Sequence, residues 1–171
     1  MTRINQFTEK GLRVTWTLVT MGFSGSSKFK GQLSGREIVE YAITRVINGD
    51  ASPQVLMLAG TDARDTEQIG CLLNKLSQGE NVDANAELRK WRAIYVANHL
   101  PTDKDDYIHG LVALGDIWAY LDFPDDSPHV FQGRNNMITP MEYYTPDNYK
   151  RLLDAHKSWL EKEITQLKDV N

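Results

Sequence analysis

Apolar residues recur every three or four positions along most of the chain, which is the spacing of one face of an α-helix. The clearest case is segment 147–168, where Lys and Glu lie opposite a regular stripe. That stripe consists of Tyr149, Leu152, Leu153, His156, Trp159, Leu160, Ile164 and Leu167. A second stripe consists of Ile38, Val39, Ala42, Ile43, Val46 and Ile47. Both patterns predict amphipathic helices that bury one face.

Signals for helix ends bracket these stripes. Ser34 and Glu37 have the spacing of a capping box, and Asn48-Gly49 is a typical helix end. Further helix starts are predicted at Ser52-Pro53, Asp65, Asp83, Thr102-Asp103, Thr139-Pro140 and Thr145-Pro146. The helix that begins near residue 103 is expected to run to about Leu121, before Pro124, and a loop is expected over 123–138.

The helix after Asp65 is expected to bury Ile69, Leu72, Leu73 and Leu76. Cys71 lies in the same run and is expected to be a small buried hydrophobic residue. It is the only cysteine, so no disulfide can form within the chain, which suits a reducing compartment.

The first 33 residues give the least definite pattern. RVTWTLVTMGF is compatible with a strand or with a short helix opened by Thr15. We favour the helix, because a lone strand would have no partner. The sequence therefore predicts an all-α fold: a single compact domain over 1–171 with six or seven helices, mostly antiparallel neighbours.

Composition narrows the class of protein further. Apolar residues make up 41% and charged residues 25% of the 171 positions, which is ordinary for a globular domain. No apolar run approaches the roughly 18 residues of a membrane span, and the N-terminus lacks the apolar core of a secretory signal. We expect a cytoplasmic protein that does not contact a membrane.

Charge is unevenly distributed along the chain. The net charge is −4, but residues 1–36 carry six basic side chains and one glutamate. Residues 103–126 carry seven aspartates and one lysine around a mostly apolar segment. A surface of this kind repels nucleic acid over most of its area and attracts basic proteins.

Known catalytic and metal-binding patterns do not occur. The aspartates lack the spacing of an EF-hand loop, and the four histidines are scattered singly, so we expect no metal and no cofactor. His109 is two helical turns from Asp116, too far for a hydrogen bond, although it could pair with Asp105. His156 is expected to be a core residue whose ring bonds a backbone carbonyl. We therefore expect no enzymatic activity.

The acidic segment has two interpretations. Its carboxylates can simply solvate and cap a helix, or they can form a docking surface for a basic protein, with aromatic side chains as anchors. The candidate partner-binding residues are Asp103, Asp105, Asp106, Tyr107, Asp122, Phe123, Asp125 and Asp126.

The segments VTWTLVTMGF, LSGREIVEYA and VLMLAG, in this order, resemble the front half of a family of small helical bacterial proteins of unassigned activity. Such proteins are similar to the immunity proteins of polymorphic and contact-dependent growth inhibition toxin systems. The resemblance implies no catalytic residues. It implies an antitoxin, monomeric or weakly dimeric, that occludes the C-terminal domain of a cognate toxin, for example a basic nuclease. The first alternative is a helical protein-interaction adaptor without an antitoxin role. An unrecognised hydrolase ranks after it.

Overall fold

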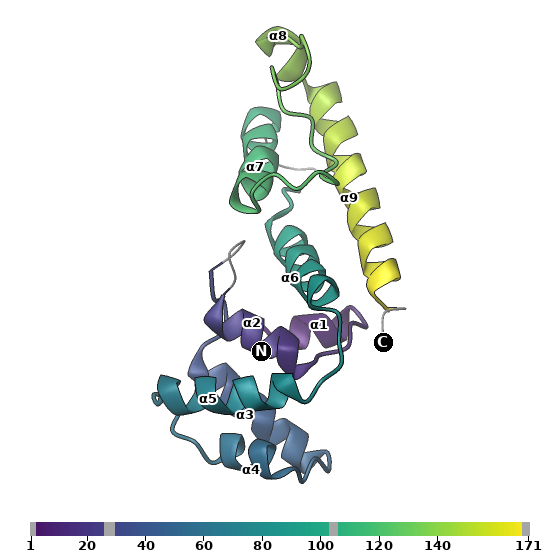
Figure 1. Cartoon of the computed structure of the whole chain (residues 1–171). Helices are drawn as coiled ribbons and strands as arrows, with labels where there is room; N and C mark the ends of the chain where they lie inside the picture. Colours follow the sequence, from purple (N-terminus) through teal and green to yellow (C-terminus); the bar gives the residue numbers. More distant parts are fainter. Residues whose placement is uncertain (1–2, 26–29, 103–105, 169–171) are drawn as a thin grey trace. The chain divides into compact units, whose positions relative to one another are not determined.

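The computed structural model describes residues 3–25, 30–102 and 106–168, and within these ranges every regular element is an α-helix (Figure 1). The helices are α1 (Asn5–Glu9), α2 (Trp16–Ser24), α3 (Gly35–Ile47), α4 (Pro53–Ala59), α5 (Thr66–Gln78), α6 (Ala84–His99), α7 (Tyr107–Tyr120), α8 (Pro140–Tyr143) and α9 (Pro146–Lys168). The predicted all-α class is confirmed. The described residues form nine helices rather than six or seven, and the short α1 was not anticipated.

The chain folds as two compact units, which are described separately. Unit 1 comprises Met1–Trp91 with Leu167–Asn171, and unit 2 comprises Arg92–Gln166. Unit 1 contains α1–α5 and the first half of α6, and unit 2 contains the rest of α6, α7, α8 and most of α9. One domain over 1–171 therefore stays a prediction.

In unit 1, polar side chains fix the start of α2 and decide the helix–strand ambiguity of the sequence. The Thr15 hydroxyl accepts the Leu18 backbone N–H at 3.0 Å. The Glu80 carboxylate accepts the backbone N–H groups of Trp16 and Thr17 at 2.9 and 2.8 Å. The first donors of α2 are thus satisfied, and the negative charge complements the helix dipole.

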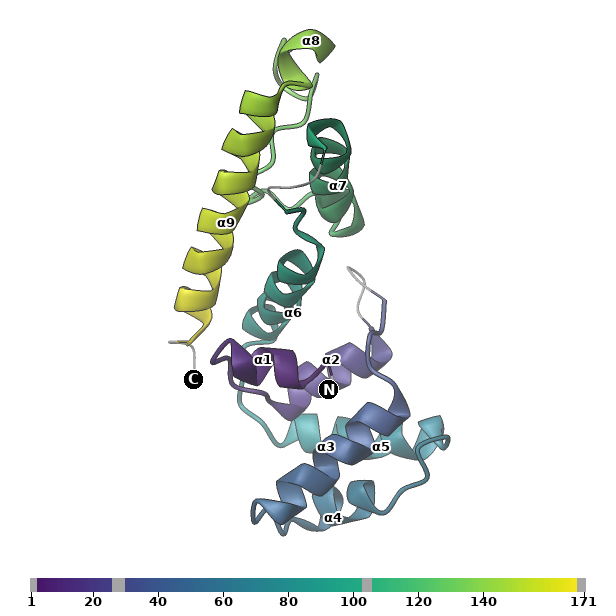
Figure 2. The ribbon, with the colours of Figure 1, turned by 180° about the vertical axis from the view of Figure 1, so that it is seen from behind.

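The predicted capping box of α3 is present: the Ser34 hydroxyl and the Glu37 carboxylate each accept a backbone N–H of the other residue. The predicted stripe is wider than the face that α3 buries. Ile38 is fully buried, but Ile43 and Ile47 are 41% and 77% exposed. Figure 2 shows α3 beside α4, and these two helices pack together.

α5 begins as predicted, with the Asp65 carboxylate accepting the Gln68 backbone N–H at 2.9 Å. Ile69 and Leu73 are fully buried. The prediction for Cys71 is wrong, because this residue is exposed. Two positions along a helix correspond to a rotation of about 200°, so Cys71 lies on the side opposite both buried neighbours.

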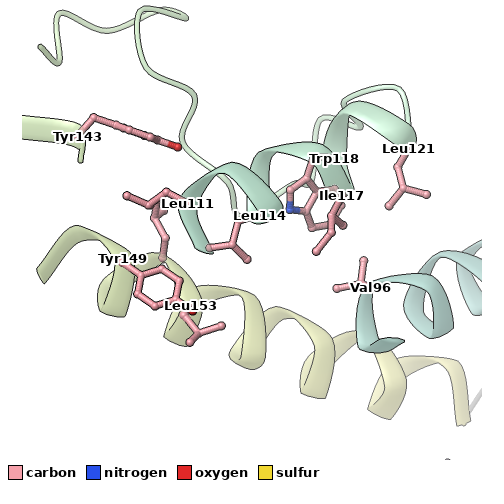
Figure 3. Packing of buried hydrophobic residues seen from close by; sticks show 10 residues of the cluster. Val96, Leu111, Leu114, Ile117, Trp118, Leu121, Tyr143, Tyr149 and Leu153 are labelled. Carbon is pink, nitrogen blue, oxygen red and sulfur yellow. The ribbon is translucent and has the colours of Figure 1, made fainter. Parts of the chain in front are cut away.

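The core of unit 2 lies between α7, α9 and the end of α6 (Figure 3). Trp118 is its largest fully buried side chain. Gly110 of α7 packs directly on Tyr149 of α9, and a Cβ at Gly110 would lie 2.4 Å from the tyrosine ring. The Tyr149 hydroxyl donates to the Thr102 carbonyl at 2.7 Å, which fixes the ring in place.

The start of α7 differs from the prediction. The helix begins at Tyr107, and its N-cap is Asp106 rather than Thr102. Its end at Tyr120 is within one residue of the predicted Leu121. α9 begins at Pro146 as the proline signal predicts, and the Thr145 hydroxyl accepts the Asn148 backbone N–H at 3.2 Å.

Candidate functional site

The first group of candidate residues lies at the N-terminus of α7. The Asp106 carboxylate accepts the backbone N–H groups of Ile108 and His109 at 3.0 and 3.3 Å, and these bonds lower its pKa. It also lies 3.2 Å from the His109 ring. Asp106 therefore has a structural role as a helix cap. Its neighbour Tyr107 packs partly against the core of unit 2. The candidates Asp103 and Asp105 lie outside the described residues.

The second group follows the C-terminus of α7, where the backbone is unusual. Asp122 and Phe123 both have positive φ, 59° and 48°. This left-handed region costs roughly 1–2 kcal/mol for a residue with a side chain, and it persists only where neighbouring contacts fix it. Here the Phe123 ring meets the edge of Phe131 with centroids 5.0 Å apart, and the Arg134 guanidinium lies 4.9 Å from its centroid.

Asp126 is not a free carboxylate. It accepts two hydrogen bonds from the Arg92 guanidinium, at 2.7 and 2.6 Å. Arg92 also bonds Glu163 at 3.0 Å and lies 5.1 Å from the ring centroid of Trp159. The Arg92 side chain is only 14% exposed, so Asp126 ties the loop after α7 to the core of unit 2.

The carboxylates of Asp122 and Asp125, unlike those of Asp106 and Asp126, have no partner in the described fold. Both residues are exposed, and within the part of the chain that the structure describes neither carboxylate makes an ion pair or a hydrogen bond. Phe123, which lies between them in the sequence, is 37% exposed. These three residues are the exposed members of the second group that make no ion pair within the described residues, and they are called the α7 exit below.

The two groups do not converge on one point. α7 has 14 residues and therefore separates its ends by about 21 Å. A partner that touches both groups must follow the length of the helix. A small ligand at either end cannot reach the other.

A buried polar cluster lies elsewhere in unit 2, and sequence reasoning found only part of it. The Trp118 indole donates to Nε2 of His156 at 2.7 Å, and Nδ1 of His156 lies 2.6 Å from the Leu152 carbonyl. These partners fix the neutral ring with its proton on Nδ1, so the predicted structural role of His156 is confirmed. Burial lowers its pKa.

His129 completes this cluster and was not singled out in the sequence, where it lies in a loop without any periodic signal. Its Nε2 is 3.0 Å from the Tyr143 hydroxyl, and its Nδ1 is buried without a hydrogen-bond partner. The ring is 5.5 Å from that of His156. Burial, and secondarily the nearby His156, lower the pKa of His129 from 6.5 to about 4.

Unit 1 contains a buried ion pair that the sequence did not reveal. The Lys90 ammonium donates to the Glu87 carboxylate at 2.8 Å and to the Arg13 carbonyl at 3.0 Å. The other Glu87 oxygen accepts the Thr15 hydroxyl at 2.9 Å. Both charged side chains are at most 3% exposed, so the pair joins α6 to the start of α2 rather than facing a ligand.

Two further results concern binding chemistry. Among the residues that the structure describes, no three His, Cys, Asp or Glu side chains are grouped so that they could hold a metal ion. No helix within the described ranges is both long enough and apolar enough to span a membrane.

These features define a small all-α protein with unpaired carboxylates and an exposed aromatic ring at the end of one helix. A family model described as "Uncharacterized protein conserved in bacteria (DUF2247)" matches residues 4–164, so the chain belongs to this family. No curated protein and no solved structure matches the chain. The family assignment agrees with the predicted resemblance to small bacterial proteins of unassigned activity, and it shows no link to immunity proteins.

Proposed function

We propose that this chain is an immunity protein, which binds the toxic domain of a cognate effector and neutralises it by occlusion. The observation that carries the proposal is the α7 exit, where two unpaired carboxylates lie beside an exposed aromatic ring. Protein interfaces commonly combine an aromatic anchor with charges that steer the partner. The same function is implied by the resemblance of VTWTLVTMGF, LSGREIVEYA and VLMLAG to small helical bacterial proteins that are similar to immunity proteins.

Preorganisation of the α7 exit favours a binding role. The positive φ angles of Asp122 and Phe123, together with the contacts that Phe131 and Arg134 make, hold the loop in one conformation. A loop that is already ordered loses little conformational entropy when a partner binds. Strained backbone of this kind is often found at functional sites.

The charge of the α7 exit selects the chemistry of the partner. Asp122 and Asp125 present two carboxylates that make no ion pair within the described residues, so a basic protein surface is attracted and an acidic one is repelled. Complementary fields raise association rates above the roughly 10⁶ M⁻¹s⁻¹ of neutral pairs. A basic nuclease domain is a partner of this chemistry.

The test is co-expression in bacteria with the C-terminal domain of a large secreted toxin whose gene lies directly before the gene for this chain. We expect the wild-type chain to restore growth and to co-purify with the toxin domain. The double variant Asp122→Lys/Asp125→Lys is expected to lose both properties.

The matched control is Asp154→Lys/Glu161→Lys, which makes the same change in net charge at exposed positions of α9. We expect this control to protect like the wild type. Equal protection by both double variants would exclude the α7 exit as the binding surface. Absence of protection by the wild-type chain would contradict the immunity function itself.

A further inference from the structure

α7 differs from the other long helices on its solvent side. Between Tyr107 and Tyr120 it has only one carboxylate and no lysine or arginine. A helix that is apolar on all sides is ordinarily buried on all sides. In this structure, however, one side of α7 is open to solvent. Two large apolar residues lie on this side: Ile108 is 44% exposed and Val112 is 47% exposed.

The open side of α7 is continuous along the helix. It is formed by Ile108, Val112, Asp116 and Ala119, which are all exposed and follow one another at intervals of four, four and three residues. These intervals place them on one face of the helix. We call these four residues the α7 stripe. Three of its four residues are apolar, and Asp116 is its only charge.

The segment of the sequence that contains the α7 stripe carries charges of one sign. Residues 105–133 contain no lysine and no arginine. Their six carboxylates belong to Asp105, Asp106, Asp116, Asp122, Asp125 and Asp126. Among those of the six that the structure describes, Asp126 pairs with Arg92 and Asp106 lies beside the His109 ring. The other described carboxylates make no ion pair with the described residues. An occupant of the stripe therefore meets an apolar strip within a negative field.

We propose that the α7 stripe is the docking site for an amphipathic, basic helix of the partner protein. The apolar face of that helix covers Ile108 and Val112, and its backbone approaches closely at Ala119. Its lysine or arginine residues lie near Asp116 and near the α7 exit, about 21 Å from the start of α7. This inference deepens the proposed function, because it names the element of the partner that the chain recognises.

Charge also disfavours two other possible occupants of the α7 stripe, a second copy of the chain and an anionic lipid surface. A second copy of the chain would place its own α7 stripe against this one, so that the two Asp116 carboxylates would meet at close range. An anionic lipid surface would be repelled by the same carboxylates. A basic helix is the occupant that gains from both the apolar and the acidic residues.

The first test uses a fluorescein-labelled helical peptide of about 18 residues, built from leucine and lysine with leucine at helical spacing. The comparison peptide has the same composition with the leucines scattered around the helix. Fluorescence anisotropy at low salt measures binding of each peptide to the full chain. We expect the amphipathic peptide to bind more tightly by at least about tenfold, because only it has an apolar face.

The variant Ile108→Ser/Val112→Ser is expected to weaken binding of the amphipathic peptide by at least about tenfold. The control Ile43→Ser/Ile47→Ser on α3 has the same spacing and similar or greater exposure, and is expected to bind within about twofold of the wild type. Ala119→Arg is a second blocking variant that leaves the apolar residues intact. Circular dichroism verifies that each variant is folded.

Unchanged binding in both α7 variants would overturn the proposal, as would an equal loss in the α3 control. Sedimentation that reveals a wild-type dimer abolished by Ile108→Ser/Val112→Ser would also overturn it, since the occupant would then be a second copy. Co-expression separates this inference from the proposed function. If Ile108→Ser/Val112→Ser still protects against a toxin that the wild type neutralises, the docking site is wrong and the function stands.

Discussion

Acid should destabilise this protein through His129, because the buried ring has to take up a proton that its surroundings do not favour. The pKa of His129 is lowered from 6.5 to about 4. The groups that face the ring are Tyr143, Phe131 and the neutral His156, and none of them offers a negative charge. The Trp118 indole donates to Nε2 of His156 and so keeps His156 neutral. His156 therefore offers no negative charge that would balance a protonated His129.

The sign and size follow from linkage between protonation and folding. A histidine whose pKa is lower in the folded state binds its proton in the unfolded state first, so its contribution is complete above pH 6.5 and is lost as the pH falls towards about 4. One pKa unit corresponds to about 1.36 kcal/mol, so the lowering amounts to about 3 kcal/mol over this window. That is a large share of the roughly 5–15 kcal/mol that stabilises a typical domain.

The assay is urea unfolding of the wild type and of His129→Gln at several pH values between neutral and about pH 4.5. Glutamine retains a polar group near the Tyr143 hydroxyl but does not titrate. We expect the free energy of unfolding to fall less steeply with acid in His129→Gln, by roughly 2 kcal/mol over the range. Tyr143→Phe, which keeps the imidazole and most of its burial, should retain the wild-type slope. Parallel curves for the wild type and His129→Gln would refute the reasoning.

Two further predictions concern stability. Asp126→Asn should lower the free energy of unfolding by about 1 kcal/mol, because it weakens the pairing of Arg92, whereas the exposed Asp125→Asn should change it by less than about 0.5 kcal/mol in urea unfolding. Equal effects would show that the ion pair does not stabilise the loop. Gly110→Ala should destabilise by about 1–3 kcal/mol, because its Cβ would lie 2.4 Å from a buried tyrosine ring. Gly70→Ala in α5 should raise the thermal midpoint, because its Cβ would lie 3.7 Å from the Phe23 ring. A rise in the thermal midpoint for Gly110→Ala as well would contradict the packing argument.

Local signals in the sequence were sufficient for the helical class and for most helix starts. Ser34, Asp65 and Thr145 act through hydrogen bonds to residues three positions away, and such bonds depend only on neighbouring sequence. The start of α7 was misplaced because Asp103, Asp105 and Asp106 all satisfy the same cap pattern. Composition cannot decide which of several adjacent aspartates becomes the cap.

Features that depend on distant residues could not be predicted. Glu80 stabilises the start of α2 from 63 or 64 positions away, and the Lys90–Glu87 pair is completed by Arg13. Ile47 is 77% exposed, and periodicity within one helix does not show which part of an apolar stripe the neighbouring helices cover. His129 is buried by contacts that a loop sequence does not encode locally.

The aspartates around α7 show why counting charges was not enough to locate a binding surface. Asp106 uses its carboxylate to cap the helix, and Asp126 uses its own to hold Arg92. Both are therefore expected to alter folding as well as binding when they are reversed. Asp122 and Asp125 make no such side-chain bond in the described chain, so a change there disturbs the fold less than a change at Asp106 or Asp126. The simultaneous reversal of Asp122, Asp125 and Asp126 would mix the two effects, and the pair Asp122 and Asp125 separates them.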